Sequence, residues 1–297
     1  MLEAVALPLI KYALSEDVGT GDITSLNCIR GGVQARASLV ARRDGVVAGA
    51  DIARLVFKEV DPTLKFRLTT GDGSAITAGQ AIAQVTGDAG SILKAERTAL
   101  NFLQHLSGIA TLTKRYVDAI AGTGATLLDT RKTTPGLRFL EKYAVRCGGG
   151  DNHRLALWDM YLVKDNHIRA AGGVTAAIDR ISRTRQGDLL LEVEVDSLEQ
   201  LNEALRPEVY RILVDNQSPA EVKKAVAVVD RWCAEHPPDS PRMRAGARRW
   251  PEVEVSGGLS LERIRAYAET GADYLSVGAL THSAPALDVS LEVEEVG

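Results

Sequence analysis

The alternation of hydrophobic and polar positions changes character about a third of the way along the chain. Residues 35–50 and 64–85 contain short β-rich runs that Gly-Asp-Gly and Ala-Gly turns interrupt. Residues 92–114 instead place apolar side chains near i, i+3, i+4 and i+7, which predicts a long amphipathic helix. The pattern therefore predicts an N-terminal α+β domain over residues 1–110 that ends around this helix.

Residues 111–281 alternate between short apolar strands and helical patterns. Such alternation is typical of parallel strands with right-handed helical crossovers, in either a barrel or a doubly wound sheet. We expect the C-terminal tail, residues 282–297, to join the N-terminal domain. The expected strands are 125–130, 161–164, 189–195, 211–215, 252–256 and 274–277, and the expected helices are 138–147, 174–184, 198–205, 219–233 and 261–270.

Polar and glycine residues at the ends of these strands distinguish the two folds. Barrel active sites take residues from the C-terminal ends of many strands, whereas a doubly wound sheet concentrates its site at one switch point. Six strands are fewer than eight, so we predict an α/β fold with an incomplete (β/α) barrel. The strand-end residues are Arg131 and Lys132, Lys164 and Asp165, Glu194 and Asp196, Asp215 and Asn216, Ser256 to Gly258, and Gly278.

The loops after the first two barrel strands carry an excess of positive charge. Residues 129–169 hold eight Lys or Arg against five Asp or Glu, in a chain of 297 residues with a formal net charge of −4. Arg131 and Lys132 directly follow a predicted strand, and Arg154 and Lys164 are close to another, with His153 beside them. Arginine suits carboxylates and lysine suits phosphates, so we expect a pocket for a small, multiply charged anion.

Acidic residues follow on the next two strands. Glu192, Glu194 and Asp196 alternate along one strand and therefore share a face. Glu194 near the barrel lumen would need a cation, a metal or a ligand hydroxyl as its partner. Asp165, Asp196 and Asp215 have an alternative explanation as helix N-caps, and for Asp196 we favour that explanation.

Two glycine junctions follow the last two strands. Ser256-Gly257-Gly258 and Val277-Gly278-Ala279 can present backbone N–H groups where barrels commonly hold a phosphate. A Gly-Gly pair alone is usually a tight turn, but two junctions on neighbouring strands favour phosphate binding.

Composition narrows the class of protein further. Hydrophobic residues make up 45% and charged residues 25%, as in an ordinary globular protein. No apolar run is long enough for a membrane span, the N-terminus lacks signal-peptide features, and the negative net charge argues against nucleic-acid binding. Cys28, Cys147 and Cys233 show no disulfide or zinc spacing, which predicts a reduced, cytoplasmic protein.

We expect Trp158 and Met160 to pack internally, and the Pro- and Arg-rich segment 236–250 to form an exposed loop.

The chain resembles the quinolinate phosphoribosyltransferase family, also called carboxylating nicotinate-nucleotide pyrophosphorylases. The resemblance covers nearly the whole length and follows many ordered blocks, which makes chance similarity implausible. The blocks include 16–24, 96–103, 106–110, Asp129-Thr-Arg-Lys-Thr-Thr-Pro-Gly136, 142–146, Gly148-Gly-Gly-Asp-Asn-His-Arg154, Lys164-Asp-Asn-His167, 192–197, 256–258, 267–271 and 277–283.

This resemblance implies a sandwich-like N-terminal domain, a C-terminal incomplete barrel, and a homodimer or a hexamer built from dimers. It implies transfer of the phosphoribosyl group of phosphoribosyl pyrophosphate to quinolinate, aided by Mg²⁺, with release of pyrophosphate and CO₂.

The family also implies roles for particular residues. Arg131, His153, Arg154 and Lys164 would line the quinolinate and phosphoribosyl sites, and Arg97 would come from the neighbouring subunit. Lys132, Glu194 and Asp215 would be the catalytic group that serves the ribosyl pyrophosphate, with Glu194 and Asp215 near its metal. The other implied substrate-binding residues are Thr130, Ser256, Gly257, Gly258, Val277, Gly278 and Ala279.

Two other functions remain open at this point. A paralogous branch associated with molybdenum uptake shares the fold, but the intact Asn152-His153-Arg154 and Arg131-Lys132 argue against it. A non-catalytic anion- or nucleotide-binding barrel would have no need of acids at the strand ends, so Glu194 and Asp215 argue against that class.

Overall fold

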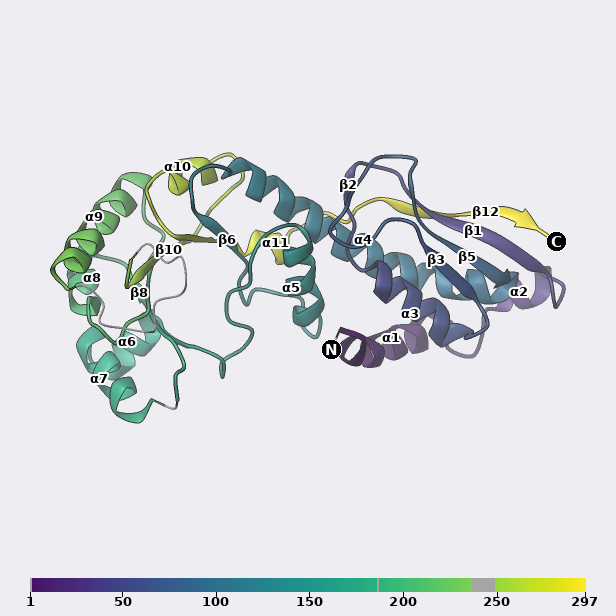
Figure 1. Cartoon of the computed structure of the whole chain (residues 1–297). Coiled ribbons are helices and arrows are strands. Elements are labelled where there is room, and N and C mark those ends of the chain that lie inside the picture. Colours follow the sequence, from purple (N-terminus) through teal and green to yellow (C-terminus); the bar gives the residue numbers. More distant parts are fainter. Residues whose placement is uncertain (1, 186, 237–248) are drawn as a thin grey trace. The chain divides into compact units, whose positions relative to one another are not determined.

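A computed structural model describes residues 2–185, 187–236 and 249–297 (Figure 1). The chain divides into two compact units, each described here by itself. Unit 1 comprises Met1–Lys114, Lys132–Gly150 and Ala279–Gly297, and unit 2 comprises Arg115–Arg131 and Asp151–Gly278. The predicted domain boundaries stay a prediction, because a compact unit need not be a domain that folds independently.

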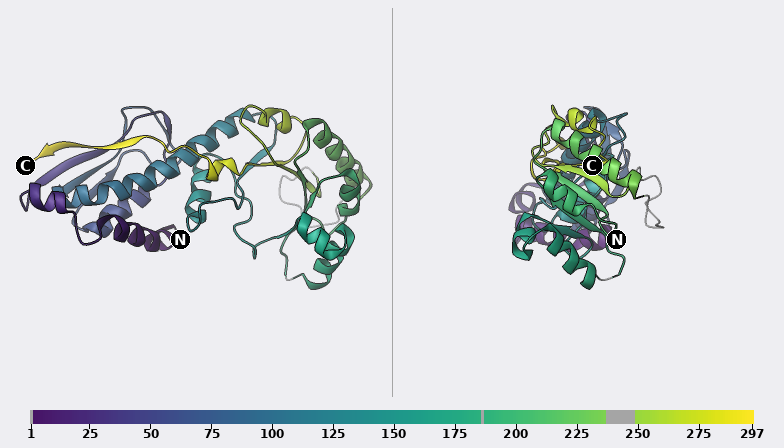
Figure 2. Two further views of the ribbon diagram at one scale, coloured as in Figure 1. Left: turned by 180° about the vertical axis from the view of Figure 1, so that it is seen from behind. Right: turned by 90° about the vertical axis from the view of Figure 1, so that its left-hand side faces the viewer.

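Unit 1 is built on a four-stranded antiparallel sheet in the order β12-β1-β5-β3. The C-terminal strand β12 pairs along β1, as the left view of Figure 2 shows in yellow and purple. The strands are β1 (Gln34–Ala41), β3 (Lys65–Leu68), β5 (Ala81–Asp88) and β12 (Val289–Val296), with a small ribbon of β2 (Gly45–Val46) and β4 (Ala75–Ile76).

The helices of this unit include the long amphipathic helix that the sequence predicts. It buries Leu103, Leu106 and Ala110 on one face, at the spacing expected of a helix packed on a core. At Gly108 an added Cβ would lie 2.2 Å from the Pro285 carbonyl oxygen, so only glycine lets the C-terminal segment approach this closely. The helices are α1 (Leu2–Val18), α2 (Ile23–Cys28), α3 (Ala50–Val60), α4 (Ala89–Ala119, whose last turns belong to unit 2), α5 (Arg138–Cys147) and α11 (Ala279–His282).

Unit 2 contains six parallel strands in the order β6-β11-β10-β9-β8-β7. The order follows the chain around a ring, and the last strand pairs with the first, but β6 and β7 do not pair with each other. The sheet is therefore a barrel left open between these two strands, and the predicted fold class is confirmed. The strands are β6 (Thr126–Leu128), β7 (Tyr161–Val163), β8 (Leu191–Val195), β9 (Arg211–Asp215), β10 (Glu252–Ser256) and β11 (Tyr274–Ser276).

Helices connect the barrel strands and lie on their outer side (Figure 1). The longest begins at a capping box, in which the Ser218 hydroxyl accepts from the Glu221 N–H and the Glu221 carboxylate accepts from the Ser218 N–H. The helices are α6 (Asp165–Ala171), α7 (Val174–Thr184), α8 (Leu198–Ala204), α9 (Pro219–Glu235) and α10 (Ile264–Ala268). In the described part of the chain, no helix is long and apolar enough to cross a bilayer.

Several expectations about single residues were wrong. Asp196 does not cap α8, because β8 ends at Val195 and the chain needs two further residues to turn; Ser197 accepts the capping bond from the Gln200 N–H instead. Asp165 lies inside the first turn of α6. Trp158 is 71% exposed, whereas Met160 is buried as predicted. Of the predicted loop 236–250, only His236, Arg249 and Trp250 are among the described residues.

Candidate active site

The segment that carries His153 and Arg154 lies beside the open side of the barrel. Asp151 makes a single parallel bridge with Leu128, the last residue of β6. The fully buried Asp129 then accepts hydrogen bonds from the His153 N–H at 2.9 Å and from the Asn152 amide at 2.5 Å. These contacts fix the backbone of the segment just before its two functional side chains.

A second carboxylate fixes the chain just after Arg154. The Asp159 oxygens accept the N–H groups of Leu155 and Ala156 at 2.6 and 2.8 Å. Arg154 itself donates from Nη1 to the Met160 carbonyl at 3.1 Å. The backbone on both sides of His153 and Arg154 is therefore anchored by acidic side chains of the same unit.

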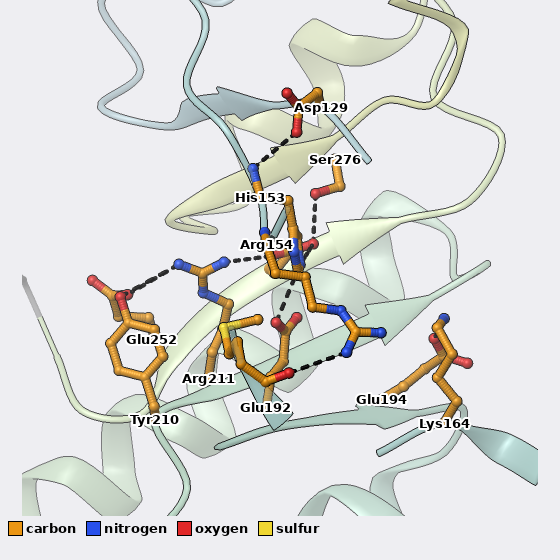
Figure 3. Close-up of polar contacts among 12 residues, drawn as sticks. Asp129, His153, Arg154, Lys164, Glu192, Glu194, Tyr210, Arg211, Glu252 and Ser276 are labelled. Carbon is orange, nitrogen blue, oxygen red and sulfur yellow. Dashed lines mark hydrogen bonds and ion pairs between the residues drawn. The ribbon is translucent and has the colours of Figure 1, made fainter. Parts of the chain in front are cut away.

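Inside the barrel, His153 belongs to a set of oppositely charged side chains that we call the buried ionic cluster: His153, Glu192, Arg211 and Glu254. Figure 3 labels the first three of them. His153 Nε2 lies 3.1 Å from Glu192 Oε2 and 3.3 Å from Glu254 Oε1. Arg211 Nη1 donates to Glu254 Oε2 at 2.7 Å, and the Ser276 hydroxyl donates to Glu254 Oε1 at 2.5 Å. Both glutamates are fully buried, so each depends on these partners to offset its loss of hydration.

The pKa values of the cluster follow from burial and from the neighbouring charges. Burial lowers the pKa of His153, but the Glu254 charge and the hydrogen bonds to Glu192 and Glu254 together raise it to about 10. Burial raises the pKa of Glu192, and the charge of Glu254 adds to this. Burial also favours the neutral form of Glu254, yet His153 and Arg211 bring its pKa down to about 2. Glu254 is therefore ionised at neutral pH.

The position of the shared proton follows from the hydrogen bonds of the His153 ring. Nδ1 accepts from the Arg154 N–H at 2.7 Å, so that nitrogen carries no proton and Nε2 carries the ring proton. The raised pKa values of His153 and Glu192 mean that the proton which keeps the cluster neutral is held between these two groups at neutral pH. With this proton on either group, the four side chains carry no net charge.

The cluster also satisfies a simple geometric criterion for a metal site, since one ligand atom each from His153, Glu192 and Glu254 lie within 4.8 Å of one another. The Arg211 guanidinium already binds Glu254 and lies 3.9 Å from the centre of the Tyr274 ring. A second cation next to this guanidinium would be repelled. We therefore assign the cluster as an internal ion-pair network.

The arginines of the predicted anion pocket lie close to each other. Burial lowers the pKa of Arg154, and the positive charge of Arg131 lowers it further, because the two guanidinium groups repel. The Arg154 guanidinium points toward the side where Lys164 and Glu194 lie (Figure 3). Two like charges held together in a partly buried place form a site that suits an anion.

The predicted strand-end residues of β7, β8 and β9 supply further charges. Lys164 is the N-cap residue of α6 and donates from Nζ to Glu194, whose side chain is only 13% exposed. Asp215 ends β9 and accepts from the Asn216 side-chain amide at 2.6 Å. The name rim residues is used below for Arg131, Arg154, Lys164, Glu194 and Asp215.

The two predicted glycine junctions differ in how tightly they are packed. Gly257 and Gly258 follow β10 with φ values of +95° and +62°, in the left-handed region. An added Cβ at Gly257 would lie 2.2 Å from Asn216 Oδ1, so a side chain has no room between the ends of β9 and β10. Val277 N donates to the Leu128 carbonyl and Gly278 follows it. The α10 helix begins only at Ile264, three residues later than expected, so the first junction does not lead straight into a helix.

Glu194 and Asp215 are the residues that suit a magnesium ion. Carboxylate oxygens are the ligands that Mg²⁺ prefers, and Mg²⁺ usually keeps several waters and substrate phosphates in its shell. Because Glu194 is already paired with Lys164, we expect any contact with the ion to run through water or substrate.

Not every predicted site residue lies in unit 2. Arg97 is exposed on α4, and Arg97, Lys132 and Ala279 all belong to unit 1, so their part in this site stays a prediction. Thr130, at the end of the β6 segment, belongs to unit 2.

Sequence reasoning missed three residues of the buried ionic cluster and its support: Asp129, Arg211 and Glu254. The available signal was the repeated Glu-x-Glu pattern of Glu192–Glu194 and Glu252–Glu254 on two barrel strands. Charged residues at inward positions of two strands require a cation on an element between them, which Arg211 supplies.

Comparisons with known proteins agree with this geometry. Residues 22–107 and 109–292 match the models of the quinolinate phosphoribosyl transferase N-terminal and C-terminal domains. A carboxylating nicotinate-nucleotide pyrophosphorylase of Mycobacterium leprae is 46% identical over 96% of this chain and 95% of its own length. Decarboxylating quinolinate phosphoribosyltransferase 1b of Nicotiana tabacum is 40% identical over 96% of this chain and 81% of its own length. The structure of the nicotinate-nucleotide pyrophosphorylase from Francisella tularensis matches with a TM-score of 0.88 at 37% identity, covering 98% of this chain and 97% of that one. The chain therefore belongs to the quinolinate phosphoribosyl transferase family.

Proposed function

We propose that the protein is a pentosyltransferase of NAD biosynthesis. It joins quinolinate to the phosphoribosyl group of phosphoribosyl pyrophosphate and releases pyrophosphate and CO₂, giving nicotinate mononucleotide. The observation that carries the proposal is the close pair of Arg131 and Arg154 beside an internally neutral ionic cluster. Membership of the family supports the same activity.

Charge complementarity explains how the acid substrate would bind. Quinolinate carries two carboxylates on adjacent ring carbons, and a guanidinium can bind a carboxylate through two parallel hydrogen bonds. Arg131 and Arg154 would hold the carboxylates, with Lys164 and His153 nearby. The buried ionic cluster balances its own charges, and Arg131 and Arg154 add positive charge beside it.

The acids on the rim would act on the ribosyl substrate. As pyrophosphate departs, positive charge develops at the anomeric carbon, and fixed carboxylates stabilise such charge without reorganising. Glu194 and Asp215 would stabilise that charge or orient the ribose hydroxyls. Lys132 and Lys164 would neutralise the leaving pyrophosphate, and the 5′-phosphate would lie against Ser256, Gly257, Gly258, Gly278 and Ala279, with Thr130 and Val277 lining the same pocket.

The proposal includes Mg²⁺ near Glu194 and Asp215, held through water or through the substrate. When bound, the ion supplies positive charge that offsets the charge of the pyrophosphate. The protein itself would supply the carboxylates of Glu194 and Asp215, which lie at the ends of neighbouring strands. The cationic side chains of the rim would bind the other end of the substrate.

Loss of CO₂ would need orientation more than an added acid or base. Once the ring nitrogen is bonded to the ribose it carries a positive charge, and that charge stabilises the carbanion left when the adjacent carboxylate departs. Arg131 and Arg154 would hold the acid so that this carboxylate leaves toward an open side. The chain's residues would therefore bind and align the acid, and the ring carbon would keep the electron pair until it takes up a proton from water to form the C–H bond of the product.

We further propose that the protein works as a homodimer or a hexamer built from dimers, with Arg97 completing the neighbouring site. The exposed position of Arg97 on α4 supports a contact outside its own unit. We also propose a cytoplasmic location, which the three free cysteines support.

The deciding experiment incubates the purified protein with quinolinate, phosphoribosyl pyrophosphate and Mg²⁺ and measures CO₂ and nicotinate mononucleotide. Formation of both products in equal amounts supports the proposal. Ligand binding without products would favour a non-catalytic anion-binding barrel. Phosphoribosyl transfer to another acid, with none to quinolinate, would favour the paralogue associated with molybdenum uptake.

A further inference from the structure

The His153 ring is held by the protein at both of its nitrogens. Nε2 lies against Glu192 and Glu254, at 3.1 and 3.3 Å. Nδ1 accepts the Arg154 N–H at 2.7 Å. Only 7% of the side chain is exposed. A substrate could bond to either nitrogen only by breaking one of these contacts, so the role of the ring is better explained by what it holds in place.

What the ring holds in place is Arg154. The hydrogen bond to Nδ1 comes from the backbone N–H of Arg154, so the ring position sets where this residue begins. One nitrogen of the Arg154 guanidinium, Nη1, donates to the Met160 carbonyl. Another, Nε, is buried and has no hydrogen-bond partner in the described part of the chain. Buried donors without partners are costly, and a guanidinium with unused donors is suited to a carboxylate.

Stability alone does not account for the two glutamates that hold the ring. Burying two carboxylates is expensive, and a hydrophobic pair of similar volume is often at least as stabilising. Both side chains are fully buried, and neither lies at the rim where a substrate could touch it directly. Their contacts with His153 give them a use that a hydrophobic pair would lack, because they fix the orientation of a ring.

We propose that Glu192 and Glu254 are positioning residues for the acid substrate: they fix the His153 ring, and the ring fixes Arg154 beside Arg131 as a preformed carboxylate site. The inference rests on the proposed function, since it takes quinolinate as the acid. His153 contributes to quinolinate binding as a support for Arg154, with neither nitrogen donating to the substrate.

The test compares steady-state kinetics of the full-length protein and three variants, with each substrate varied in turn at saturating Mg²⁺. Glu192→Ala removes the 3.1 Å ion-pair contact with Nε2 and should raise the KM for quinolinate by about tenfold. The KM for phosphoribosyl pyrophosphate should stay within about twofold of wild type. Glu192→Gln keeps an oxygen facing Nε2 and should restore the quinolinate KM to within about threefold.

Glu252→Gln is the matched control. Glu252 is also buried in the barrel and lies 3.6 Å from Arg211, with the Tyr274 hydroxyl donating to it at 3.2 Å. In the described part of the chain it forms no hydrogen bond or ion pair with His153. It should lower the melting temperature without a change specific to quinolinate. If Glu192→Ala does not fold, Glu192→Asp, which withdraws the carboxylate by one methylene, replaces it, with an expected rise in quinolinate KM of about threefold.

The outcomes separate the two claims. Equal changes in both KM values, an unchanged quinolinate KM, or an amide variant no better than the alanine variant would each overturn the positioning role. Wild-type protein that forms no nicotinate mononucleotide would refute the proposed function. Wild-type turnover with variants that fail the pattern above would refute the inference alone.

Discussion

In the buried ionic cluster each charge has an opposite charge beside it, whereas on the rim Arg131 repels Arg154. The two regions use similar residue types, and both take residues from β8 and β9. Glu192 and Glu194 show the contrast within a single strand, since one faces His153 and the other pairs with the half-exposed Lys164. The difference shows that the cluster is complete without a ligand, while the rim is built to receive one.

The largest expected effect comes from breaking the cluster. Glu254→Ala leaves Arg211 buried without its main carboxylate partner and should lower the free energy of unfolding by about 3–5 kcal/mol. Chemical denaturation followed by circular dichroism measures this loss. A decrease below about 1 kcal/mol would mean that the cluster is not a stabilising network.

The same substitution has a predictable pH dependence. Because the pKa of Glu254 is lowered from 4.5 to about 2 in the folded state, its ionised form stabilises the fold above pH 4.5. That stabilisation is lost as the pH falls from there toward 2. The difference in unfolding midpoint between wild type and Glu254→Ala should therefore shrink on acidification, and a constant difference would contradict the assignment.

Neutralising an acid on the rim should affect turnover and leave the fold intact. Glu194→Gln removes a charge near the anomeric carbon and should lower kcat by about 100-fold with a small change in either KM. Thermal unfolding should show little loss, since the pair with Lys164 is partly exposed. Near-normal turnover would exclude Glu194 from stabilising the developing cation.

Removing a cation from the rim should affect substrate affinity. Arg131→Ala should weaken quinolinate binding by about 2 kcal/mol, because a carboxylate loses a charged hydrogen-bond partner. Isothermal titration with quinolinate measures the change. An unchanged affinity would remove Arg131 from the acid site, and Arg169→Ala, on the exposed side of α6, serves as a control for net charge.

The smallest effect is expected at a histidine–glutamate contact in unit 1. His105 Nε2 lies 2.9 Å from the buried Glu141, whose other oxygen accepts the Thr134 N–H at 3.1 Å. His105 is 33% exposed and has one carboxylate partner, so His105→Ala should cost about 1 kcal/mol of stability. Chemical denaturation measures this loss. A loss of free energy of unfolding as large as that expected for Glu254→Ala would mean that the buried ionic cluster stabilises the fold no more than a half-exposed contact does.

The barrel could be predicted from the sequence because short strands rich in Val, Leu and Ile alternate with helical patterns along the chain. The predicted bounds of β9 and β10 match the structure at both ends, since each run is bounded by clear polar or turn residues. The rim residues could also be predicted, because strand ends meet at one edge of a barrel.

The buried ionic cluster could not be predicted, because its pairs join residues of different strands. Sequence spacing places Glu192 and Glu194 on one face, but the register that sets Glu192 opposite Arg211 is a property of the folded sheet. The predicted helix cap at Asp196 was wrong by one residue, because the position of the strand end is also set by the folded sheet. The predicted packing of Trp158 was wrong because the hydrophobicity of a side chain does not by itself determine its burial.

The pairing of β12 with β1 has a consequence for how the protein is made. The last strand of the chain, Val289–Val296, forms an edge of the sheet that the first strand begins. During synthesis, β1 cannot pair with β12 until the whole barrel sequence between them has been translated. The barrel can assemble while the chain is still growing, but the N-terminal sheet is completed only after β12 has left the ribosome.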